Sequence, residues 1–207
     1  MFKNNELLGG LRLKLISQNV KTKMQKIFWP NLSKIFVIRG LDDFIMVEPK
    51  IKCEFIPISL DNYHRVVDFR EENRISNYRD KLARNEIGYF AEHNGKMIGS
   101  VWATINKTDT PRVVQKFTKI MYNEALVHDN VVSEKFRGMR VGPFMEASMF
   151  IVLFSEYGVN RIKADVNVRN HASLQMLDKL NLRVDHRLLC IAVFNKVILE
   201  LVLRKHN

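Results

Sequence analysis

The 207-residue sequence predicts an α/β (α+β) fold, with one mixed central β-sheet flanked by helices and a basic N-terminal helical arm. Two observations carry this prediction. A strand, a loop, a helix and a second strand follow one another between residues 120 and 168, an order that indicates a parallel strand pair joined by a crossover helix. Hairpin patterns lie on both sides of this unit, and hairpin strands run antiparallel. The sheet is therefore expected to be mixed.

The predicted organisation is an arm with a short strand over residues 1–48 and a main domain over residues 49–207. Residues 1–33 contain six basic residues before Lys34 against a single acid, and their apolar residues recur near helical spacing. This pattern favours a helix packed on the domain or on a partner chain, with a helix lying on an anionic membrane as the alternative. Trp29-Pro30 is expected to end the arm, because the residue before proline disfavours helix. Residues 34–40 then form the short strand.

The next elements follow from local patterns. Residues 51–59 alternate polar and apolar side chains as a strand does, and residues 60–70 and 72–84 have helical patterns. Asn94-Gly95 sits between two strand-like runs in residues 88–105, which predicts a β-hairpin with a type I′ turn. A long strand is expected over residues 120–133.

Helices and strands also alternate in the C-terminal half of the chain. A helix over 143–157 is apolar nearly all round, so it should be buried, and Gly158 should end it in the left-handed conformation. Residues 161–168 alternate as a strand. Residues 170–180 form a helix with Asn170 as N-cap. Two further strands, 184–193 and 196–204, close the chain.

Composition narrows the function without deciding it. The net charge of +11 favours anionic partners such as nucleotide cofactors, nucleic acid or acidic membrane. No nucleic-acid-binding signature is present, so no nucleic acid partner is expected. Cys53 and Cys190 are far apart and belong to no Cys/His cluster, which predicts no metal site and a reducing, cytoplasmic environment. The longest apolar run, residues 149–154, is far shorter than the ~20 residues of a spanning helix.

The loop EKFRGMRVG, residues 134–142, carries the strongest chemical signal. Glycines let the backbone approach an anion closely, arginines add forked donors, and a helix start adds unpaired N–H groups and positive potential. Together they suit a pyrophosphate. A solvated surface turn is the alternative. The loop matches neither a Walker A motif nor GxGxxG.

Three segments resemble one family, the GNAT superfamily of GCN5-related N-acetyltransferases. VSEKFRGMRVG (132–142) resembles its motif A, NHASLQMLDKLNL (170–182) is similar to its motif B, and YFAEHNGKMIGSVWA (89–103) is similar to its second and third strands. The resemblance covers roughly residues 51–205. The motif A matches are Val132, Phe136, Arg137, Gly138, Val141 and Gly142, whereas Arg140 stands where glycine is usual.

The resemblance implies acetyl-CoA as acyl donor. Its pyrophosphate would be held by the loop amides, and its pantetheine arm would pair with the main chain of Val131 and Val132. Asn170 and Ser173 would lie near it, although Asn170 is equally well explained as a helix cap. Arg140 is expected to adopt a positive φ less readily than glycine. The loop residues concerned are Arg137, Gly138, Met139, Arg140, Val141 and Gly142.

Glu124 and His128 are the candidate catalytic residues. They share one face of the strand before the loop, because side chains alternate along a strand, and either could take a proton from an amine. The alternative is that each merely satisfies a hydrogen-bond partner. Relatives place a general-acid tyrosine where Leu177 stands here, and Tyr157 and Tyr122 are the other tyrosines considered.

The sequence thus suggests an acetyl-CoA-dependent N-acetyltransferase that acts by direct transfer to the primary amine of a small molecule or amino sugar. A non-catalytic domain that binds CoA or a partner is the alternative, and a basic nucleic-acid binder is a third hypothesis. A cytoplasmic protein is expected, with peripheral membrane contact through residues 1–28 and a homodimer as further hypotheses.

Overall fold

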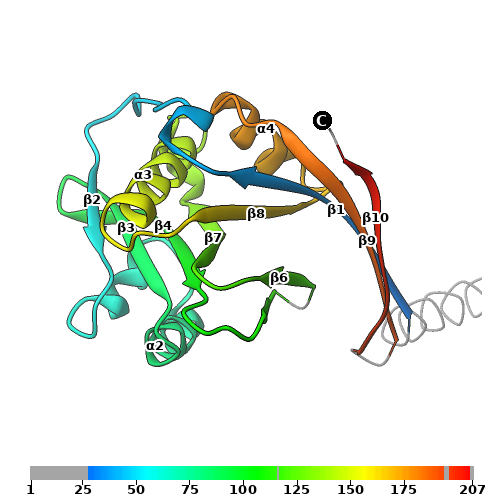
Figure 1. The fold of residues 1–207 in the computed structure, drawn as a ribbon. Coiled ribbons are helices and arrows are strands. Elements are labelled where there is room, and N and C mark those ends of the chain that lie inside the picture. The colour runs from blue at the N-terminus through cyan, green and yellow to red at the C-terminus, as the bar shows by residue number, and fades with distance from the viewer. Residues whose placement is uncertain (1–27, 116, 194–195, 206–207) are drawn as a thin grey trace, which may run out of the picture.

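A computed structural model describes residues 28–115, 117–193 and 196–205 (Figure 1). Residues 1–27, on which the expected basic arm falls, lie outside these ranges. Eight of the strands form one sheet in the order β10-β9-β1-β8-β7-β4-β3-β2. Within it β7 and β8 run parallel and the other neighbours antiparallel, which confirms the mixed sheet. The strands are β1 (Phe28–Ile38), β2 (Glu54–Pro57), β3 (Ile87–His93), β4 (Lys96–Ile105), β7 (Glu124–Val132), β8 (Arg161–Asn167), β9 (Val184–Val193) and β10 (Lys196–Lys205).

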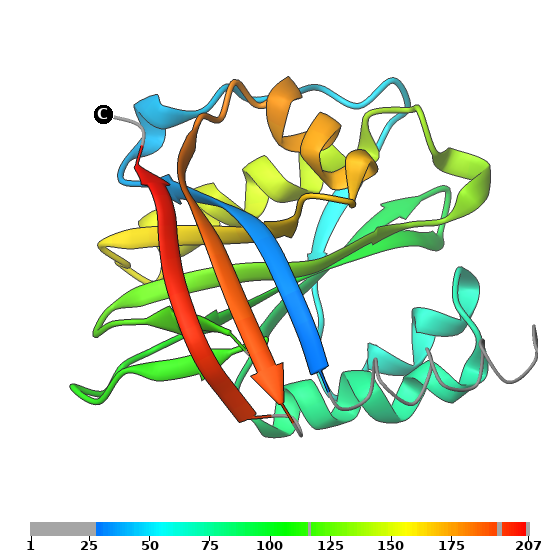
Figure 2. The ribbon, with the colours of Figure 1, turned by 90° about the vertical axis from the view of Figure 1, so that its right-hand side faces the viewer.

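The strand β1 begins six residues earlier than the sequence indicated, so Trp29-Pro30 does not end a helix there but lies inside a strand. Pro30 pairs with Ile191 of β9, whereas pairing with β8 starts only at Ser33. At Pro30 the edge of β1 that faces β8 therefore has no strand partner. Because proline has no N–H, it is tolerated at such an edge, where no hydrogen bond of the sheet is lost. Figure 2 shows β9 between β1 and β10. The division of the chain at residue 49 stays a prediction.

Helices cover both faces of the sheet (Figure 1). On one face lie α3 (Val141–Ser155) and α4 (His171–Lys179), which pack on the main core. In α3, buried side chains occur all round the helix, as its sequence predicted. Gly158 has φ +59°, and the Val159 N–H donates to the Leu153 carbonyl across it, so the expected left-handed cap is present. The short 3₁₀ turns η1 (Leu41–Asp43) and η4 (Glu134–Phe136) flank this face.

The opposite face carries α2 (Ile75–Ala83), which follows the 3₁₀ turns η2 (Tyr63–Asp68) and η3 (Glu72–Arg74). The expected helix over 60–70 is thus a 3₁₀ helix, and the one over 72–84 starts as 3₁₀. Tyr78 of α2 packs edge-on against Trp102 of β4 at 5.2 Å between ring centroids. Its hydroxyl lies 2.5 Å from Ser100 Oγ, which anchors the helix on the sheet.

A small hairpin, β5 (Arg112–Val114) and β6 (Thr118–Ile120), was not predicted and lies on the same side of the sheet as α2. The beginning of the expected strand 120–133 belongs to β6 and its following turn. By contrast, the hairpin β3–β4 turns through Asn94 and Gly95, both with positive φ, as a type I′ turn requires. No helix among the described residues is both long and apolar enough to cross a membrane.

Candidate active site

The parallel strands β7 and β8 separate halfway along their length. Their pairing runs from Glu124–Arg161 to Val127–Ala164 and stops there, although β7 continues to Val132 and β8 to Asn167. Within the described residues, the second half of β7 therefore has no strand partner on its β8 side. Main-chain N–H and C=O groups that are not used in the sheet can bind a ligand in extended conformation.

A β-bulge lies in β7 where the strands separate. The register against β4 shifts by one residue between Ser100 and Trp102, so the three steps from His128 to Val131 oppose two steps of β4. Asp129 has φ +49° at this point. A bulge re-aims side chains and frees main-chain groups from the ladder. The Asn130 side chain ties the bulge to α3 by donating to the Gly142 carbonyl (3.0 Å) and to Glu146 Oε2 (2.7 Å).

The glycine and arginine loop connects β7 to the start of α3. Gly138 has φ +82° and Arg140 has φ +62°. Among the described residues, no acceptor partners the amides of Gly138, Arg140, Val141 and Gly142, whereas the amides of Arg137 and Met139 bond to carbonyls of η4. Unpaired amides at a helix start, with the helix dipole behind them, form an anion site. This arrangement fits a pyrophosphate.

Arg140 adopts the left-handed conformation with φ +62°, which an arginine takes less readily than a glycine does. The arginine therefore keeps the backbone path of a glycine and adds a guanidinium. The helix starts at Val141, so Pro143 is its third residue and not its first, and its missing N–H belongs to the first turn, where no intrahelical acceptor is needed. Arg137 is exposed, and its guanidinium pairs with Glu134 at 3.0 Å.

Asn170 and Ser173 lie at the start of α4. The Asn170 side chain accepts a hydrogen bond from the Ser173 amide at 3.2 Å, so the capping role of Asn170 is present in the structure. α4 also packs against the loop: an added Cβ at Gly142 would stand 3.3 Å from Met176 Sδ and 3.6 Å from Val132 Cγ2. Glycine therefore suits this position because strand, loop and helix converge there.

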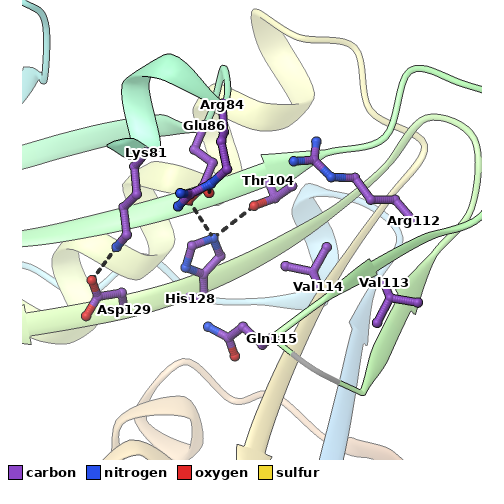
Figure 3. Close-up of a pocket in the computed structure, with 10 residues that line it drawn as sticks. All are labelled: Lys81, Arg84, Glu86, Thr104, Arg112, Val113, Val114, Gln115, His128 and Asp129. Atoms are coloured by element: carbon purple, nitrogen blue, oxygen red, sulfur yellow. Dashed lines mark hydrogen bonds and ion pairs between the residues drawn. The ribbon is translucent and has the colours of Figure 1, made fainter. Parts of the chain in front are cut away.

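A cavity of about 560 Å³ opens beside the bulge, on the face that α2 and the β5–β6 hairpin cover (Figure 3). His128 lies in it, with Nε2 3.0 Å from Thr104 Oγ1 and 3.5 Å from Glu86 Oε2. Burial, and then the charge of Lys81, lower the pKa of His128 from 6.5 to about 4. The imidazole is therefore neutral at pH 7 and able to accept a proton. The lining residues are Lys81, Arg84, Glu86, Thr104, Arg112, Val113, Val114, Gln115, His128 and Asp129.

Glu86 was missed by sequence reasoning. It lies between α2 and β3, and its Oε1 accepts from Arg84 Nε at 2.8 Å. Its Oε2 is buried without a hydrogen-bond partner among the described residues. An acid directly before a buried strand was its only sequence signal, and that signal is weak because such positions are often exposed.

Asp129 is held by two cations from the α2 side. Lys81 Nζ pairs with one oxygen, and Arg70 lies 3.5 Å from the other. Burial lowers the pKa of Lys81 below its ordinary value, against the attraction of Asp129. These contacts fix the residue that carries the positive φ of the bulge.

Glu124 does not share the cavity with His128. It begins β7, where its buried carboxylate accepts from Lys163 Nζ (2.7 Å), Arg161 (2.9 Å) and the Met121 amide (2.9 Å). Burial alone would raise the pKa of Glu124, but the hydrogen bonds from Lys163 and from the Met121 amide outweigh it and hold the pKa below its usual range. These contacts favour a structural role for Glu124.

The tyrosines considered as general acid lie away from the loop. Leu177 is completely buried in the main core. Tyr122 precedes β7 and Tyr157 follows α3, so both belong to the end of β7 opposite the loop. Among the described residues, no group of three or more His, Cys, Asp or Glu side chains could hold a metal ion.

Comparison with known families identifies the class. Residues 54–181, more than half of the chain, match the Acetyltransferase (GNAT) family. The chain therefore belongs to this family of acetyltransferases. A search of curated proteins finds no match.

Solved structures share the fold at low sequence identity. A Drosophila protein matches with a TM-score of 0.53 and 15% identity, over 87% of this chain and 58% of its own. The N-acetyltransferase of this family from Sphaerobacter thermophilus matches with 0.53 and 13%, over 84% and 55%. The glucosamine N-acetyltransferase region of a fungal multi-domain β-N-acetylglucosaminidase matches with 0.55 and 14%, over 83% and 22%. This chain thus spans less than two thirds of each of these proteins.

Proposed function

We propose that the protein is an acetyl-CoA-dependent N-acetyltransferase that acetylates a small primary amine by direct transfer. One observation carries the proposal. The bulge of β7 stands between a loop with unpaired amides on one side and a cavity with a neutral His128 on the other. Donor and acceptor can therefore reach the same point of β7 from opposite faces of the sheet.

The donor would bind along the free edge of β7. The amides of Gly138, Arg140, Val141 and Gly142 would hold its pyrophosphate, with the guanidinium groups of Arg137 and Arg140 adding charge. The main chain of Val131 and Val132 would pair with the pantetheine arm, which places the thioester near the bulge. Asn170 and Ser173 would border the site as the cap of α4.

His128 would take the proton from the attacking amine. The amine nitrogen forms a bond to the thioester carbonyl carbon, the carbon–sulfur bond breaks, and the amine proton passes to the neutral imidazole. Glu86 Oε2, 3.5 Å from Nε2, would stabilise the imidazolium that forms. A main-chain N–H of β7 at the bulge would polarise the carbonyl. Because Leu177 offers no acid, the thiolate would take its proton from solvent.

A thiol-release assay with acetyl-CoA and a panel of primary amines tests this function. We expect His128→Gln to lower kcat by roughly 10²–10⁴-fold, as loss of a general base does. The Kd of acetyl-CoA should stay unchanged, because His128 lies outside the loop. The matched control is His64→Gln, which changes an exposed histidine on η2.

Two results would count against the proposal. Failure to bind acetyl-CoA would show that the loop has lost its donor. Binding of acetyl-CoA without turnover of any amine would favour the alternative of a non-catalytic CoA-binding or partner-binding domain. A cytoplasmic location, membrane contact through residues 1–28 and the absence of a nucleic acid partner rest on the sequence alone.

A further inference from the structure

Positive charge gathers on the acceptor side of the bulge. Lys81, Arg84 and Arg112 line the cavity that holds His128. A second cavity of about 200 Å³ shares Lys81, Arg84 and Asp129 with it and adds Arg70 and Arg74. The two cavities together therefore contain five cationic side chains, which face three acids, Asp80, Glu86 and Asp129.

Most of these cations already have carboxylate partners. Lys81 and Arg70 bind Asp129, and Arg84 binds Glu86 through Nε. Arg74 and Arg112 have no carboxylate partner among the described residues, and the Arg112 guanidinium donates only to the Ile105 carbonyl, at 3.4 Å. A guanidinium has five N–H donors, so most of those of Arg112 stay free. Figure 3 shows the Arg112 side chain reaching from β5 toward Arg84 and Thr104.

Glu86 contributes a carboxylate to the same cavity. Its Oε2 is buried without a hydrogen-bond partner among the described residues, and a buried acceptor in that state is destabilising. It lies 3.5 Å from His128 Nε2, so a ligand amine that reached both atoms from the cavity would satisfy it. The cavity thus offers an acceptor for an amine near the bulge and donors for an anion at the β5 side.

We propose that the acceptor is a small primary amine that also carries an acidic group, a carboxylate or a phosphate. This inference rests on the proposed function and names its substrate class. The amine is directed to Glu86 and His128, and the anion is bound by Arg112 together with the free N–H groups of Arg84. The cavity of about 560 Å³ has room for a molecule the size of a sugar phosphate. Polycationic amines are rejected by the same arginines.

Matched acceptors that differ only in the anion provide the test. Glucosamine 6-phosphate against glucosamine tests a phosphate, β-alanine against propylamine tests a carboxylate, and spermidine tests a polycation. We expect the anionic member of at least one pair to have a kcat/KM at least about tenfold higher, and spermidine to be the poorest acceptor. The pair with the larger ratio identifies the anion.

Arg112→Gln should remove this preference. The KM for the anionic amine should rise roughly 10- to 100-fold, the range for losing hydrogen bonds to a charged group, while the KM of the neutral amine should change much less. Arg112→Lys should restore part of the preference, since it keeps the charge without the fork. The control is Arg79→Gln, which removes the same charge from the exposed part of α2 outside both cavities.

Binding of glucosamine 6-phosphate, β-alanine and inorganic phosphate, measured by calorimetry, separates this inference from the proposed function. Turnover of neutral amines at rates equal to those of anionic ones would overturn the inference and leave the function standing. If no amine is acetylated but Arg112→Gln abolishes binding of one of these anions, the function fails and the anion site stands. Equal binding by the wild type and Arg112→Gln would overturn the anion site.

Discussion

The burial of His128 makes the stability of the fold depend on pH in the acid range. Its pKa of about 4 in the folded protein lies below the ordinary value of 6.5, so the folded state binds fewer protons between these values. The free energy of unfolding therefore has its full value above pH 6.5 and decreases as the pH falls toward 4. At pH 5 the loss should be about 2 kcal/mol, because one pKa unit corresponds to about 1.4 kcal/mol.

Urea unfolding at pH 7 and pH 5 measures this effect. We expect His128→Gln to lose about 2 kcal/mol less than the wild type between the two pH values, since glutamine does not titrate. His64→Gln should follow the wild type, because it removes an exposed histidine. Equal pH dependence of all three proteins would show that His128 is not held neutral.

Arg140→Gly tests the arginine that stands in place of a glycine. A non-glycine residue at φ +62° costs roughly 1 kcal/mol, so the variant should have an equal or higher melting temperature. Because the backbone of Arg140 already follows the path of a glycine, we infer that its side chain adds a phosphate contact. The Kd of CoA, measured by calorimetry, should therefore rise about 3- to 30-fold in the variant. Tighter binding would indicate a loop that has lost the contact.

The β4–β7 pair is packed too tightly for any side chain at Gly99. An added Cβ would stand 2.8 Å from the Val131 carbonyl oxygen and 2.9 Å from Met145 Cε. A methionine end can move, but the carbonyl belongs to the sheet. We expect Gly99→Ala to lower the free energy of unfolding by about 1–3 kcal/mol and to weaken CoA binding, since Val131 must shift.

The control for this substitution is Gly40→Ala, because nothing lies within 4 Å of a Cβ there and φ is extended. Denaturant unfolding and CoA calorimetry on both variants decide the matter. If Gly99→Ala changed the free energy of unfolding and the Kd of CoA no more than Gly40→Ala does, the contact between Gly99 of β4 and Val131 of β7 would not be tight.

Elements with strong local sequence signals were predictable. Very short elements, and elements whose conformation depends on tertiary packing, were not. Asn94-Gly95 predicted its turn because two positive φ angles are a local requirement. The β5–β6 hairpin was missed because strands of three residues are too short to show a period. The region 60–70 was expected to be helical. It forms a 3₁₀ helix whose buried residue Val66 packs in one cluster with residues of α2 and β3, a contact that the local sequence pattern does not show.

The edge strand β10 is apolar and exposed, which bears on the predicted homodimer. Ile198 and Val202 are 62% and 53% exposed, and Leu201 and Leu203 are also exposed. β10 pairs with β9 on one side and is the outer strand of the sheet. A long, exposed apolar edge is a template for pairing with another strand. We propose that a second copy of the chain covers it.

Light scattering after size exclusion tests the dimer. The wild type should elute with twice the mass of the 24.3 kDa chain, and Ile198→Lys combined with Val202→Lys should elute as a monomer, because charge on an edge blocks pairing. Leu60→Lys, at another exposed leucine, should leave the dimer intact. A wild type that is monomeric at high concentration would exclude this interface.

The sequence by itself determined the crossover unit, the buried α3 and the family, and it predicted an anion site in the loop, because periodicity, glycine spacing and motif order are local properties of the chain. Only the tertiary structure decided which side chains share the site. Glu124 and His128 lie on one strand, yet Glu124 forms ion pairs with Lys163 and Arg161. His128 instead shares a cavity with Glu86 and Arg112, which are more than twenty residues apart in the sequence. Burial and long-range pairing set the charge state of each group, and no short stretch of sequence encodes either.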